Sequence, residues 1–256
     1  MGQRPGSDTR RRAGRTPRAG LAVGAACVAL LGLALLFPPK RALAQASAGD
    51  ILRLDAFDRT YPANETPPGW AARKFSPLVG SGERYVFQFV HAGAQEHYVR
   101  LQSGRDNSYL LGYEKGLPLA EWPVLEWEWK IVTLPKNGDV RVKERDDQAG
   151  AVCIVLDPGI ATFDSSLCYL FENDGPKDTP ITSTKKDNAR HLILRTAKSG
   201  DPLGQWLRER RNVLQDYKRV FGHDPQKPAY FGMMIDSNDT ESSAEAFYRN
   251  LVLRKS

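Results

Sequence analysis

The sequence predicts a mainly β protein, an antiparallel, jelly-roll-like β-sandwich with one amphipathic helix docked on it. Residues 125–131 (LEWEWKI) alternate between apolar and charged side chains, which is typical of a strand with one buried and one wet face. Residues 151–157 (AVCIVLD) form an apolar, β-branched run typical of a central strand. Many further short runs of this kind, with a single helical segment, favour a sandwich.

These runs follow one another along the chain, bounded by Gly, Pro or polar residues. We expect strands at residues 51–57, 72–75, 84–90, 97–103, 109–113, 125–131, 151–157, 166–171, 190–196, 229–236 and 246–254. Residues 173–188 form a long polar loop with two prolines. Residues 204–221 predict the helix, because apolar residues recur there at three- and four-residue steps before Gly222.

Residues 1–46 are predicted to be an export signal. An Arg-rich start precedes the apolar stretch 19–37, and residues 42–46 contain two small-x-small cleavage motifs. An uncleaved membrane anchor is the alternative, because an apolar stretch of this length lies near the lower limit for spanning a bilayer. We therefore expect residues 47–256 to form one exported domain, periplasmic or secreted, that meets a membrane only through an uncleaved leader.

The basic character of the chain comes from this leader. The whole chain carries a formal net charge of +6, and residues 1–46 hold eight Lys and Arg against one Asp. The leader therefore carries +7, and residues 47–256 are left with −1. Global charge gives nucleic-acid binding no support, and we predict no nucleic-acid partner.

Two cysteines remain beyond the leader, Cys153 and Cys168. They lie almost symmetrically on two expected strands around the turn-like residues 158–164, so a cross-strand disulfide is one prediction. Two buried free thiols are the alternative.

The charged run at Arg145, Asp146 and Asp147 is a candidate ligand-binding turn. Adjacent carboxylates on an extended chain point to opposite sides, so they form no acid–base pair by spacing alone. A purely structural turn is the alternative. Trp70 and Trp122 stand beside prolines in expected loops, which makes them candidate exposed platforms for sugar stacking.

Glu126 and Glu128 are weak catalytic candidates. They share one face of the expected strand, where two carboxylates could act on a glycosidic bond. The plain interpretation is that wet strand faces carry Glu and Lys for solubility.

Asp55, Asp236 and Asp239 are weak calcium candidates, because carboxylate oxygens suit calcium and the first and last strands could bring them together. A turn that bonds its own backbone is the alternative for the last two. We predict no other cofactor or metal.

On the expected helix, Arg210, Arg211 and Asp216 could dock it on the sandwich through Arg–carboxylate pairing, with Asp146 or Asp147 as partners. Binding of an acidic ligand through Arg210 or Arg211 is the alternative.

Four segments together resemble an exported bacterial family of unknown function, DUF3047. They are LEWEWK (125–130), KERDDQAG (143–150), RERRNVLQDYKRVFG (208–222) and IDSNDTESSAEAFYRNL (235–251). The resemblance covers residues 50–254 and implies export and one domain, without an established reaction. A looser, architectural similarity is to galactose-binding-like jelly rolls, in which Asp55 and Asp236 would belong to the first strand and the last turn.

These observations favour non-catalytic binding of a carbohydrate or cell-envelope component. A polysaccharide-acting hydrolase or lyase that uses the strand carboxylates is the first alternative. An envelope scaffold without a small ligand is the second.

Overall fold

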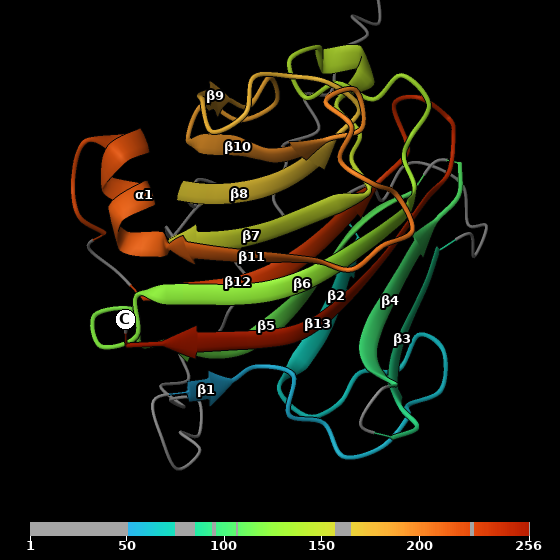
Figure 1. Ribbon diagram of the computed structural model, residues 1–256, viewed down its shortest axis with the longest axis vertical. Coiled ribbons are helices and arrows are strands. Elements are labelled where there is room, and N and C mark those ends of the chain that lie inside the picture. The colour runs from blue at the N-terminus through green and yellow to red at the C-terminus, as the bar shows by residue number, and fades with distance from the viewer. Residues whose placement is uncertain are drawn as a thin grey trace, which may run out of the picture. The chain divides into compact units, whose positions relative to one another are not determined.

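The computed structural model describes residues 51–74, 85–93, 96–105, 107–156, 165–225 and 228–255. The predicted export segment and the predicted turn at 158–164 lie outside these ranges. Among the described residues, no helix is long and apolar enough to cross a membrane. The predicted fold class is confirmed, because this part of the chain forms two facing β-sheets and one α-helix (Figure 1).

The first sheet has six strands in the order β11-β6-β13-β4-β3, with β1 paired to β13. Their bounds are β1 (Ile51–Arg53), β3 (Tyr85–His91), β4 (His97–Ser103), β6 (Val124–Thr133), β11 (Leu207–Asn212) and β13 (Ala244–Arg254). All pairs in this sheet are antiparallel. Strand β6 lies between β11 and β13, which come from distant parts of the chain (Figure 1).

The second sheet has seven strands in the order β2-β5-β12-β7-β8-β10-β9. Their bounds are β2 (Trp70–Lys74), β5 (Ser108–Leu117), β7 (Gly150–Leu156), β8 (Ser165–Glu172), β9 (Pro180–Thr182), β10 (Ala189–Thr196) and β12 (Ala229–Asp236). Strands β8 and β10 pair in parallel, which departs from the expected antiparallel arrangement. The loop between β8 and β10 returns the chain to the end of the sheet at which β8 begins. This loop also contributes β9, which pairs antiparallel with β10.

The core lies between the sheets and is rich in aromatic side chains. Trp127 and Trp129 of β6 have no exposed surface. Their rings lie 5.4 Å from that of Tyr169 and 6.0 Å from that of Phe171 on the facing sheet, respectively. The alternation of β6 therefore has the predicted consequence: its apolar side chains join the sheets, and its charged side chains face outward.

The predicted helix begins later than expected. Residues Leu207–Asn212 form strand β11, and only Val213–Phe221 form the helix α1. Glu209 is buried where it accepts a hydrogen bond from Trp129 Nε1 at 3.2 Å, so the segment alternates like a strand. In the sequence, apolar residues continue at three- and four-residue steps from β11 into α1, so this pattern does not distinguish the strand from the helix. The Asn212 side chain then caps the helix by accepting from the Gln215 amide.

Helix α1 docks through an Arg–carboxylate pair, but not with the predicted partners. Asp216 accepts from Arg211 Nε at 2.7 Å and from the Tyr169 hydroxyl at 3.0 Å. Arg211 also donates to Asp178 at 2.9 Å. Burial and the neighbouring Asp216 raise the pKa of the Tyr169 hydroxyl well above its ordinary value, so it remains a donor. Asp146 takes no part in this docking.

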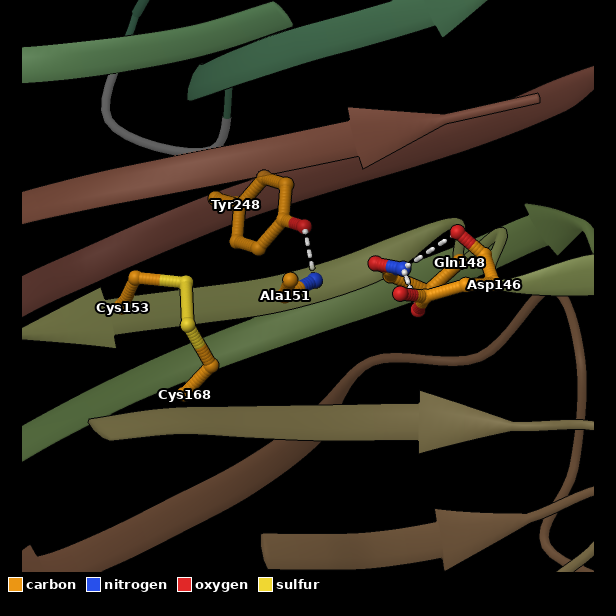
Figure 2. The surroundings of a disulfide bond; sticks show 6 residues. All are labelled: Asp146, Gln148, Ala151, Cys153, Cys168 and Tyr248. Carbon is orange, nitrogen blue, oxygen red and sulfur yellow. Dashed lines mark hydrogen bonds between the residues drawn. A yellow bond between two sulfur atoms is a disulfide. The ribbon is translucent and has the colours of Figure 1, made fainter. Parts of the chain in front are cut away.

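Cys153 and Cys168 form a disulfide between β7 and β8, where they are directly opposite each other (Figure 2). The bond belongs to a small second core on the outer face of the seven-stranded sheet, together with Leu110, Val140 and Leu170. On the inner face of β7, the hydroxyl of Tyr248 accepts a hydrogen bond from the Ala151 amide at 3.1 Å (Figure 2).

Replacing both cysteines (Cys153→Ala with Cys168→Ala) should lower the free energy of unfolding by about 3 kcal/mol, because a closed loop of 15 residues restricts the unfolded chain by roughly that amount. Urea unfolding of the oxidised protein, the reduced protein and the double variant measures the change. Reductant should destabilise the native chain and leave the double variant unchanged. Equal stability of all three would contradict the prediction.

Candidate functional site

The outer face of the six-stranded sheet carries a grid of polar and aromatic side chains. On β6, Glu126, Glu128 and Lys130 point outward between the buried tryptophans. Arg210 and Arg208 of β11 pair in register with Glu126 and Glu128, respectively. Because directly opposite residues share a face, two strands contribute to one continuous surface.

A pocket of about 190 Å³ lies in this face. The residues that line it come from β1, β6, β11 and β13, and are Ile51, Arg53, Glu126, Trp127, Glu128, Arg208, Asn250, Val252 and Arg254. Two carboxylates and three guanidinium groups therefore converge on a small volume, which is the mixture of convergent polar groups expected at a ligand site.

Glu126 occupies the centre of the charged groups and is only 5% exposed. Arg208 Nη2 donates to its Oε2 at 2.6 Å, and Arg210 Nε donates to its Oε1 at 3.0 Å. Arg254 Nε lies 2.9 Å from Oε2. Burial acts to raise the pKa of Glu126, but the guanidinium groups of Arg208 and Arg254 outweigh it and hold the pKa below its ordinary value. This carboxylate is therefore ionised.

Glu128 lies two residues further along the same face. Its Oε2 accepts from Arg249 Nε at 2.7 Å and its Oε1 from Asn250 Nδ2 at 3.0 Å. Positions two apart on a strand are separated by about 7 Å. The structure thus brings the two predicted catalytic candidates into one pocket, but each is held by arginine.

A row of aromatic side chains lies next to the pocket on the same face. Trp206, Phe247 and Tyr98 are half-buried. Lys130 Nζ lies over the ring of Trp206 at 5.2 Å and over that of Phe247 at 4.4 Å, and the Tyr98 and Phe247 rings are 5.5 Å apart. Arg249 links this row to the pocket, since its guanidinium lies 4.1 Å from the centre of the Trp206 ring while it also binds Glu128.

The sequence does not predict this aromatic row: Trp206 falls within the expected helix, among its apolar residues, and Phe247 falls within the last expected strand. The signal that could have found Phe247 is the alternation in residues 244–248 (AEAFY), where Ala244, Ala246 and Tyr248 are buried.

The two tryptophans predicted to be exposed platforms are buried, each with 5% exposure. The ring of Trp70 lies 5.3 Å from those of Phe89 and Tyr113, which come from opposite sheets. Trp122 belongs to the same core and is covered by Lys255. The prediction is therefore wrong for both, because prolines beside a tryptophan do not imply that the tryptophan faces water.

The predicted ligand-binding turn is placed away from the pocket and is largely buried. Asp147 has no exposed surface, and it accepts hydrogen bonds from the amides of Asp239 and Thr240 at 3.1 and 2.7 Å. Asp146 is 4% exposed and accepts from the Thr184 hydroxyl at 3.3 Å. Arg145 is exposed and donates to the carbonyl of residue 137. The turn thus holds three loops together.

Arg211 is engaged at the helix and does not reach the pocket. The three calcium candidates are also separated. Asp55 Oδ2 accepts from the Leu251 amide near the start of β4, whereas Asp236 and Asp239 lie beside Asp147, beyond the end of that strand. Among the described residues, no group of three or more His, Cys, Asp or Glu side chains is arranged to hold a metal ion.

Several buried carboxylates gather around the turn. Burial, with Asp146 and Asp139 nearby, raises the pKa of Glu172 well above its ordinary value. Burial, and next the charge of Asp147, raises the pKa of Asp236 well above its ordinary value. A carboxyl with a raised pKa keeps its proton in the folded chain at a pH where the unfolded chain has released it. The contribution of such a carboxyl to the free energy of unfolding is therefore fully present below its pKa in the unfolded chain. It is lost as the pH rises toward its pKa in the folded chain.

We accordingly expect Glu172→Gln to flatten the decline in unfolding free energy between pH 5 and pH 8, and to stabilise the protein at pH 8. Urea unfolding at several pH values measures both effects. Asp139→Asn is the matched control of opposite sign, because hydrogen bonds from Arg141 lower the pKa of Asp139. That variant should lose stability at neutral pH. An unchanged slope in Glu172→Gln would rule out the proposed proton uptake.

The fold and site can be compared with known proteins. The xyloglucanase domain of NopAA, a type three effector from Sinorhizobium fredii solved with cellobiose, has 9% identity, covers 75% of this chain and 95% of its own, and gives a TM-score of 0.42. A family 11 carbohydrate-binding module of a cellulosomal cellulase from Clostridium thermocellum has 11% identity, covers 75% of this chain and 90% of its own, and gives a TM-score of 0.34. These likenesses identify no function. No curated protein matches the chain.

The family comparison is more specific. The model described as "Protein of unknown function (DUF3047)" matches residues 68–252, a range that contains β6, the charged turn, α1 and most of β13. The resemblance read from the sequence is confirmed, and the chain belongs to the DUF3047 family.

Proposed function

We propose that the protein is exported and binds a carbohydrate, or a glycan component of the cell envelope, without catalysis. The ligand site is the outer face of the six-stranded sheet. The observation that carries the proposal is the juxtaposition on one rigid face of an aromatic row and a pocket lined by charged hydrogen-bonding groups.

A sugar ring has two kinds of surface, and this face offers a partner for each. Its C–H groups are apolar and pack on aromatic rings, for which Trp206 and Phe247 are available. Its hydroxyl groups need donors and acceptors at fixed positions, which Arg208, Glu128 and Asn250 supply. Because Phe247, Arg208, Glu128 and Asn250 come from strands and Trp206 directly precedes β11, their spacing is fixed before a ligand arrives, which reduces the entropy lost on binding.

Two features support export. The leader has the three parts of an export signal. The Cys153–Cys168 disulfide is of a kind that persists in oxidising compartments such as the periplasm.

The Trp206→Ala variant should bind glycan about tenfold more weakly, since a central aromatic contact is commonly worth more than 1 kcal/mol. Affinity electrophoresis in gels containing mixed-linkage β-glucan, xyloglucan, polygalacturonate or alginate measures retardation. Phe221→Ala is the matched control, because Phe221 is also half-buried beside an arginine but lies on α1. No retardation in any gel would favour a scaffold. Equal retardation of the Trp206→Ala variant and the native chain would show that the glycan binds at another site.

Catalysis is the second candidate, because Glu126 and Glu128 line the same pocket. A glycosidase needs one carboxyl that donates a proton. Glu126 is held ionised by its arginines, and both oxygens of Glu128 already accept hydrogen bonds, from Arg249 and Asn250. We therefore expect no new reducing ends from the four polysaccharides above during prolonged incubation. Release of reducing ends that Glu128→Gln abolishes would establish an enzyme and overturn the non-catalytic proposal.

A further inference from the structure

Three arginines share one carboxylate at the centre of the pocket. Arg208, Arg210 and Arg254 surround Glu126, which leaves two positive charges without a compensating anion in this group. The neighbouring Glu128 does not supply one, because Arg249 pairs with it at 2.7 Å. The excess is local, since residues 47–256 carry a net charge of −1.

The donors of these arginines greatly outnumber the oxygens of Glu126. Three guanidinium groups present roughly fifteen N–H donors, whereas one carboxylate has two oxygens. Arg208 and Arg210 each use one nitrogen on Glu126, and their side chains are 63% and 54% exposed. Arg208 lines the pocket and Arg210 lies two residues further along β11 on the same face, so their remaining N–H groups are available to a ligand on this face.

We propose that this pocket recognises the carboxylate of a uronic-acid residue, so that the glycan bound on this face is a polyuronate. The inference rests on the proposed glycan site and names its ligand class. Arg208 and Arg210 already donate hydrogen bonds to the carboxylate of Glu126, so their guanidinium groups are placed to bind carboxylates. A planar carboxylate also matches two parallel N–H donors of a guanidinium group.

The surrounding residues suit a charged sugar better than a neutral one. Arg53 also lines the pocket; its Nη1 donates to Asp55 at 3.4 Å, and because the side chain is 49% exposed its other N–H groups add donors on the β1 side. The carboxylate would bind the arginines while the sugar ring extends toward Trp206, which Arg249 places next to Glu128. Adjacent rings of the polymer would follow the aromatic row across the strands.

The test measures affinity for polygalacturonate, alginate, highly methyl-esterified polygalacturonate, xyloglucan and a phosphorylated glucan. The methyl ester keeps the sugar and removes its charge. We expect the native chain to bind at least one polyuronate ten or more times more tightly than the neutral polymers, and to lose this preference when NaCl rises from about 0.05 to 0.5 M.

The double variant Arg208→Gln with Arg210→Gln should weaken polyuronate binding at least tenfold, and Arg208→Lys with Arg210→Lys should restore only part of it, because lysine keeps the charge without the paired donors. Lys198→Gln with Lys218→Gln is the matched control, since both side chains are more than 60% exposed and neither lines the pocket. The control should bind like the native chain.

The outcomes separate this inference from the proposed function. Trp206-dependent binding of neutral glycans, with no effect of the arginine variants, would overturn the polyuronate assignment and leave the glycan site standing. Preference for the phosphorylated glucan would also overturn it. Failure to bind any of the five polymers or the mixed-linkage β-glucan above would overturn both.

Discussion

The burial of an ionised carboxylate on β6 determines the chemistry of this molecule's outer face. Glu126 is 5% exposed, and a charge in that position must be paired to be tolerated. The partners come from both neighbours of β6: Arg208 and Arg210 from β11, and Arg254 from β13. Strand pairing over long sequence distances thus creates a positively charged pocket that no local segment contains.

The same strand joins the core to the proposed site. Trp127 and Trp129 contact the opposite sheet, so β6 is held rigidly from beneath. The outward side chains of β6 are therefore held on a rigid backbone. A binding surface needs such a backbone to keep hydrogen-bond donors and aromatic rings at fixed spacing. The charged turn after β6 has a different role: Asp147 ties it to the turn before β13, and helix α1 is held separately by Arg211 and Asp216.

Most of the fold could be predicted from the sequence, and much of the site could not. The alternation around Trp127 and the apolar run containing Cys153 identify core strands because period-two burial is a local property. The boundary between β11 and α1 cannot be read from the sequence, because Leu207 and Val213 fit a helical stripe as well as they fit a strand followed by a helix. Glu126 was named, but its arginines depend on register with β11 and β13, which no local pattern reveals.

The most direct test is a map of where a uronate oligosaccharide touches the protein. In an NMR titration of the isotopically labelled protein with oligogalacturonate, we predict shift changes at the Trp206 indole N–H, the Arg208 side chain and the amides of Glu126 and Glu128. The residues around Asp146 should remain unperturbed. Changes confined to the turn around Asp146, with none on the outer face of the six-stranded sheet, would show that the glycan does not bind this face.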